Sequence, residues 1–104
     1  MSSLALAGLQ AASTRAAVRA QNISNMLTPG YQSAEPVQTS TPAGPTVTVN
    51  APPPVAPAPQ SLFADVDLPR EFVDLQMAKR AFEASAAVFK TADEMSKEAI
   101  DLLG

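Results

Sequence analysis

The chain has 104 residues, of which 46% are hydrophobic, and its formal net charge is -3. That length allows one domain at most, and we expect only a small core because alanine, which buries little area, supplies much of the apolar content. The weak acidic charge excludes a broad basic surface for nucleic acid, and the absence of histidine and cysteine excludes the commonest general base, thiolate nucleophiles and the usual zinc ligands.

Residues 2–28 predict a first helix with one apolar face built mostly from small side chains. Its apolar positions recur at steps of three and four, at Ala5, Leu9, Ala12, Ala16, Ala20, Ile23 and Leu27. Gly8 weakens the helix by about 1 kcal/mol relative to alanine, but it allows a neighbour to approach closely. No lysine or arginine precedes the apolar run, so we expect no cleavable signal peptide, and the run is too short to cross a bilayer.

The sequence from Thr28 to Tyr31, T-P-G-Y, is expected to end this helix. Pro29 disfavours helical geometry at Thr28, and Pro29 with Gly30 suits the central pair of a type II turn. Asparagine is common where helices end, so Asn25 is interpreted as a local terminator. For the other asparagine here, at position 22, a local role and a hydrogen bond to a neighbouring subunit both stay open.

Residues 29–61 are interpreted as a turn and a proline-rich flexible linker, since eight of the ten prolines lie between Pro36 and Pro59. Each proline removes a backbone donor and fixes φ, which disfavours a packed sheet or helix. Residues 46–49 alternate threonine and valine, so any strand here is expected to be a short edge strand at best. The linker is long enough to connect two helices in either relative direction.

Residues 62–104 predict a second, long helix, because residues 70–103 contain neither glycine nor proline. Asp67 is the expected N-cap, and Pro69 fits the first turn. One stripe steps by four and three and comprises Leu68, Phe72, Leu75, Lys79, Phe82, Ala86, Phe89, Asp93, Ser96, Ile100 and Leu103. The charged members Lys79 and Asp93 need a partner or solvent if this stripe is buried. A second stripe widens the C-terminal face and comprises Val88, Ala92, Met95, Ala99 and Leu102.

Together these elements predict an all-α fold, in which two long helices form an elongated, coiled-coil-like hairpin joined by a proline-rich irregular linker. The second helix would span about 50 Å, whereas a compact domain of this length has a radius of gyration near ~13 Å. The wide C-terminal face indicates several neighbouring helices rather than one. We therefore expect burial on polymerisation, with the free subunit largely unfolded or loosely helical.

Two segments resemble the axial proteins of the bacterial flagellum, the family of rod, hook and hook-filament junction subunits. Residues 20–31 are similar to the Asn-rich helix end and the T-P-G-Y of the family's N-terminal signature. Residues 66–103 resemble its terminal helix, with matches at Arg80, Ala81, Glu83, Ala84, Thr91, Asp93, Glu94 and Met95. Phe82 and Ser85 stand where the family often has tyrosine and asparagine, and the linker stands where members usually carry β-rich outer domains.

The resemblance implies a structural subunit of the flagellar basal-body rod, reduced to the paired terminal helices that form the inner tube of the axial structure. It implies partners among other axial subunits and copies of the same chain, and export as an unfolded chain through the flagellar type III apparatus. The small size favours the proximal rod. We predict neither an enzyme nor a cofactor, because no pocket-forming scaffold and no nucleophile with its base are visible.

Two alternatives stay open. The chain is also compatible with a soluble helical adaptor or export regulator that mimics the terminal helices of axial subunits. A peripheral membrane helix is disfavoured by the lack of a basic polar face. The candidate assembly residues are Asn22, Ile23, Leu27, Pro29, Gly30, Tyr31, Phe72, Leu75, Phe82, Phe89, Met95, Ile100 and Leu103. The three phenylalanines among them suit an ordinary core as well as anchors between subunits.

Overall fold

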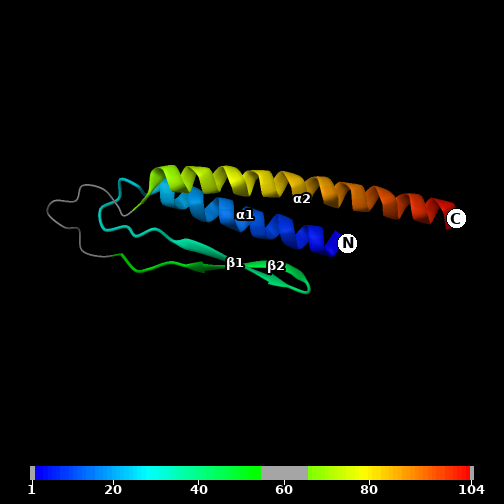
Figure 1. The fold of residues 1–104 in the computed structure, drawn as a ribbon, viewed down its shortest axis with the longest axis horizontal. Coiled ribbons are helices and arrows are strands. Elements are labelled where there is room, and N and C mark those ends of the chain that lie inside the picture. Colours follow the sequence, from blue (N-terminus) through cyan, green and yellow to red (C-terminus); the bar gives the residue numbers. More distant parts are fainter. Residues whose placement is uncertain (1, 55–65, 104) are drawn as a thin grey trace.

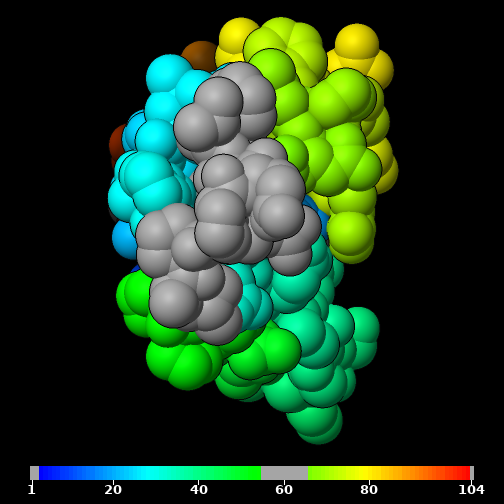
Figure 2. All heavy atoms as spheres, turned by 90° about the vertical axis from the view of Figure 1, so that its left-hand side faces the viewer, coloured from blue at the N-terminus to red at the C-terminus, as the bar shows by residue number. Residues whose placement is uncertain are grey.

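The computed structural model describes residues 2–54 and 66–103, which form two helices and one β-hairpin. The elements are helix α1 (Ser2–Ser24), strands β1 (Glu35–Thr41) and β2 (Gly44–Asn50), and helix α2 (Leu68–Leu103). Helix α1 lies in the middle, with α2 antiparallel along one side and the hairpin along the other (Figure 1). Seen from the end where α2 begins, the hairpin and the start of α2 lie on opposite sides (Figure 2). The molecule is elongated, with extents of 71 × 22 × 15 Å.

The predicted all-α fold with an irregular linker is wrong, because part of the proline-rich tract forms an antiparallel β-hairpin. The strands pair from Glu35 opposite Asn50 to Thr41 opposite Gly44. Pro42 takes the second position of the connecting turn and Gly44 the fourth, which is an arrangement that β-turns favour. Gly44 has a φ of 114°, a conformation that side chains rarely adopt.

Two prolines lie within the strands without breaking the hairpin, since a two-stranded sheet leaves one edge of each strand unpaired. Pro36 lies opposite Val49 and Pro45 lies opposite Ser40, so both prolines belong to the same alternating set of residue pairs. In antiparallel strands one such set directs its N–H groups outward, where a missing donor costs no hydrogen bond of the ladder. The composition of the tract therefore excludes a central strand but not this hairpin.

The start of α2 and the turn that follows α1 agree with the signals in the sequence. The Asp67 carboxylate accepts a hydrogen bond from the Arg70 N–H at 3.3 Å, which confirms Asp67 as the N-cap of α2. The Tyr31 N–H donates to the Thr28 carbonyl at 3.2 Å and Gly30 has a φ of 80°, as a type II turn requires. Helix α1 ends at Ser24, earlier than expected. Neither helix in the described residues has the length and apolar character of a membrane span.

Helix α1 packs on its neighbours through small side chains. The buried apolar residues in the described part of the chain are Ala5, Ala11, Ala12, Val18, Ala34 and Ala78. A Cβ added to Gly8 would lie 2.8 Å from the Ser85 Oγ of α2, and one added to Gly44 would lie 2.7 Å from the Ala7 Cβ. The close approach predicted at Gly8 is confirmed. With so little apolar volume inside, the single chain has only a thin core.

Replacing Gly8 with leucine is expected to lower the free energy of unfolding by about 1–3 kcal/mol, because the side chain would be forced against Ser85. The control is Ala17→Leu, which adds leucine at an exposed position of the same helix. Urea denaturation followed by circular dichroism measures both variants. Equal midpoints for the two leucine variants would show that the gap between α1 and α2 is not tight.

Candidate subunit interface

A buried polar cluster joins the end of α1, the turn after it, β1 and the start of α2. Its centre is Asn22, whose side chain is fully buried. The Asn22 Nδ2 donates to the Ala34 carbonyl at 2.8 Å and to the Glu71 Oε2 at 3.0 Å. The Asn22 Oδ1 accepts hydrogen bonds from the Ala34 N–H at 2.9 Å and from the Tyr31 hydroxyl at 2.7 Å. Every hydrogen-bonding position of the amide is therefore used inside the chain.

Arg19, one turn before Asn22, bonds three carboxylates. Its guanidinium contacts both Oε atoms of Glu71 at 3.2 and 3.3 Å and the Oδ2 of Asp74 at 2.8 Å. It also forms two parallel bonds to Glu35 of β1, at 3.2 and 3.3 Å. The planar fork of an arginine suits several simultaneous contacts of this kind. This one side chain thus links α1 to both β1 and α2.

Arg19 keeps its charge in spite of its burial. Burial opposes the cation and acts to lower the pKa of Arg19, but its hydrogen bond to Glu35 and the negative charges of Glu71 and Glu35 outweigh it and raise that pKa above its ordinary value. Glu71 is 1% exposed. A carboxylate this deeply buried needs a charged partner, and Arg19 is that partner.

The phenol of Tyr31 is expected to titrate at a higher pH in the folded chain than in the unfolded one. Burial, and after it the negative charge of Glu71, raise the pKa of Tyr31 above its ordinary value of 10.0. Because the folded chain holds this proton more tightly, its stabilising effect is complete below pH 10.0 and is lost as the pH rises through the folded pKa.

Phenolate absorbance measures this titration cleanly, since the chain has one tyrosine and no tryptophan. The expected midpoint lies above 10.0 in buffer and returns to the ordinary value in concentrated urea. Identical midpoints in the two solvents would contradict the burial of the Tyr31 phenol near Glu71.

Most of the candidate assembly residues lie on the surface of the single chain. Exposed members are Leu27, Pro29, Phe72, Phe82, Phe89, Met95, Ile100 and Leu103, and partly buried ones are Ile23, Gly30, Tyr31 and Leu75. Among these candidates only Asn22 is fully buried, and the partly buried Tyr31 donates a hydrogen bond to it. The stripe of α2 that contains Phe72, Phe82 and Phe89, which we name the phenylalanine stripe, lies beside the line of contact with α1. Glu71, Ala78 and Ser85 mark that line. The single chain therefore leaves Phe72, Phe82 and Phe89 exposed.

Helix α2 extends well past the beginning of α1 (Figure 1). Gly8 lies opposite Ser85, so in an antiparallel pair Ser2 lies near position 91 and residues 92–103, which we name the overhang, have no α1 beside them. Met95 is 64% exposed, and Leu102 and Leu103 are about 90% exposed.

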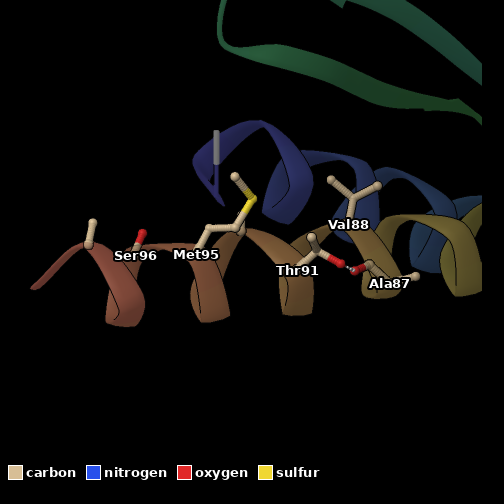
Figure 3. Close-up of a pocket in the computed structure, with 7 residues that line it drawn as sticks. Ala87, Val88, Thr91, Met95 and Ser96 are labelled. Carbon is tan, nitrogen blue, oxygen red and sulfur yellow. Dashed lines mark hydrogen bonds between the residues drawn. The ribbon is translucent and has the colours of Figure 1, made fainter. Parts of the chain in front are cut away.

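An open groove of about 560 Å³ runs along α2 at the start of the overhang. Its lining residues are Ala87, Val88, Thr91, Ala92, Met95, Ser96 and Ala99. Figure 3 shows Val88 and Met95 projecting from the same side of the helix. The Thr91 hydroxyl donates to the Ala87 carbonyl at 3.0 Å, so the helix itself satisfies this polar group. The surface is mainly apolar and suits contact with another helix.

Lys79 and Asp93, the charged members of the phenylalanine stripe, are both exposed. Asp93 pairs with Lys97 at 3.3 Å, one turn further along α2. Lys79 has no ion-pair partner among the residues that the structure describes.

Sequence reasoning did not single out Arg19 or Glu71. The signal was Arg19 itself, which follows Ala5 and Ala12 at intervals of seven on a face that is otherwise apolar.

Comparison with known families finds that residues 63–102 match the model of the flagellar basal body rod FlgEFG protein C-terminal region. No curated protein matches the chain significantly. The match covers nearly all of α2 and confirms the predicted resemblance to flagellar rod and hook proteins. It indicates a structural role in the flagellar axis and gives no indication of catalysis.

Proposed function

The chain carries the C-terminal region of the flagellar basal body rod family, and from this premise we propose that it is a structural subunit of the basal-body rod. In this proposal α1 and α2 enter the axial tube side by side and transmit torque by packing against neighbouring helices. Other axial subunits and copies of the same chain are its partners, and the flagellar type III apparatus exports it.

The observation that carries the proposal is the apolar face that the single chain leaves open. Phe72, Phe82 and Phe89 lie at 54%, 43% and 37% exposure along about half of α2. Soluble monomers rarely expose so many large apolar side chains along one helix, and such surfaces mark contacts with other proteins. Because the buried apolar residues are almost all alanines, far more apolar area is available between subunits than within one.

The experiment that tests the proposal places a tag in the proline-rich tract after the hairpin and purifies basal bodies from cells that express only the tagged chain. We expect the chain to copurify with the axial structure and immunogold labels to lie along the rod. Motility that depends on a chain absent from the axial structure would contradict the proposal and would favour an adaptor or export regulator.

The thin core supports a further part of the proposal, that the free subunit is only marginally stable and gains order on assembly. Circular dichroism should show helicity and a thermal midpoint that both increase with the concentration of the chain. A cooperative thermal transition that does not depend on concentration would contradict folding on assembly.

A further inference from the structure

The net charge of the chain is concentrated in the overhang. Residues 92–103 contain four acidic side chains and one lysine, a net charge of -3. The remaining six acidic and six basic residues cancel, since the whole chain has ten and seven. The overhang is therefore an acidic, apolar helix end attached to a body of no net charge.

A second groove lies between α1 and α2, with a volume of about 390 Å³. Ala12, Ser13 and Ala16 line it from α1, and Leu75, Gln76, Lys79 and Phe82 line it from α2. Lys79 is the one ionisable side chain among the described residues that line it. We name it the inter-helix groove. It offers an apolar floor with a single unpaired positive charge at its side.

The overhang has the complementary pattern. Met95 and Leu102 lie two turns apart on its apolar side, as Leu75 and Phe82 do in the inter-helix groove. Glu98 is three residues after Met95 and four before Leu102, so it borders that side of the helix. Glu98 has no ion-pair partner in the described part of the chain.

Elsewhere on the overhang the charge is balanced, because Lys97 pairs with Asp93 at 3.3 Å. The carboxylates of the overhang without an ion-pair partner among the described residues are Glu94, Glu98 and Asp101, spaced by four and three along one side of the helix, and Glu98 is the one within a turn of both Met95 and Leu102. An unpaired cation beside one apolar surface and an unpaired carboxylate beside another favour contact between those two surfaces, because contact with a like-charged surface would be repulsive.

We propose that the overhang of one copy lies in the inter-helix groove of a second copy, with Glu98 against Lys79. The inference rests on the proposed function in that it assumes contact between copies. Since the two surfaces occupy different parts of the chain, each copy can give its overhang to one neighbour and receive that of another. The contact would cover Phe82, Met95 and Leu102, which a single chain exposes.

Disulfide trapping tests the contact, because the chain contains no cysteine. Full-length Ser13→Cys and Ala99→Cys proteins, mixed at equal concentration under mild oxidation, should form a mixed dimer, with Ala99→Cys homodimers in the minority. A majority of Ala99→Cys homodimers would show that overhangs pair with each other and would overturn the proposal. Absence of the mixed dimer would also overturn it.

Charge exchange tests the pairing of Lys79 with Glu98. Lys79→Glu and Glu98→Lys should each reduce the mixed-dimer yield by about two- to five-fold, and the two changes in one chain should restore it. Arg80→Glu is the matched control, since it makes the same charge change one residue away and Arg80 does not line the groove. An equal loss from Arg80→Glu, or no restoration in the double variant, would contradict the pairing.

The result is separable from the proposed function. A chain that copurifies with the rod but gives no mixed dimer would overturn this contact and leave the rod assignment intact. A mixed dimer from a chain that never enters the rod would support the contact and overturn the rod assignment.

Discussion

Replacing Arg19 with alanine is expected to lower the free energy of unfolding by about 3–5 kcal/mol, because it leaves Glu71 buried without its cation. Glu71 is 1% exposed and would keep only its hydrogen bond from Asn22. Glu35 and Asp74 would lose the same partner, but both are partly exposed and can be hydrated. Since the whole chain has a thin core, this loss is large enough to unfold it at room temperature.

The matched control is Arg15→Ala, which removes an arginine one turn earlier in α1. Among the described residues Arg15 makes one hydrogen bond, to the exposed side chain of Gln38 at 3.3 Å, so we expect a change in the free energy of unfolding within about 0.5 kcal/mol. Urea denaturation followed by circular dichroism measures both. If the two variants have the same midpoint, the cluster around Arg19 does not stabilise the chain.

Deletion of residues 95–104 is expected to abolish incorporation into the rod while the remainder keeps its fold. The overhang lies beyond the beginning of α1, so its loss breaks no contact between α1 and α2 (Figure 1). What it removes is the most exposed apolar surface of the chain, which includes Met95, Ile100, Leu102 and Leu103. Immunoblots of purified basal bodies, with motility assays in the same cells, measure the outcome.

Two full-length variants separate loss of apolar surface from loss of length. Ile100→Ser with Leu103→Ser keeps the helix length and should fail to incorporate, as the deletion does. Asp93→Ala with Lys97→Ala removes an exposed pair worth about 0.2–0.5 kcal/mol and should incorporate normally. Normal rods from the deletion would show that the overhang has no role in assembly.

The helices and their ends could be predicted because local chemistry determines them. Asp67 caps α2, and Pro29 with Gly30 turns the chain, through contacts between residues close in sequence. The hairpin could not be predicted from composition, since proline counts do not reveal register. Only the pairing of residues 35–50 places Pro36 and Pro45 in the same alternating set, where both are tolerated.

The polar cluster was missed because its partners are far apart in the sequence and each has an ordinary local explanation. Glu71 suits the positive end of α2, and Asn22 suits a helix terminus. The phenylalanine stripe could be predicted, but its partner could not, since periodicity identifies an apolar face and does not say which chain covers it. The departure from the family pattern at Ser85 is explained by the structure, because Gly8 leaves room there for a small side chain only.

The cluster also resolves an ambiguity in the helix pair. Small residues repeat every seven positions on both helices, at Ala5 and Ala12 and at Ala78, Ser85 and Ala92. Sliding α2 along α1 by seven residues would still place small residues against each other. Arg19 meets Glu71 in one alignment alone, and any other would lose this buried ion pair.

The long separation between Arg19 and Glu71, 52 positions in the chain, has a consequence for timing. A chain that emerges from a ribosome or a narrow channel with its N-terminus first releases Arg19 and Asn22 while Glu71, the acidic partner that they share, is still inside. Helix α1 therefore waits without its buried ion pair until about two thirds of the chain has emerged. The chain therefore completes its fold only after the start of α2 has emerged. Until then, the residues before α2 can still pass through a channel or bind a neighbouring subunit.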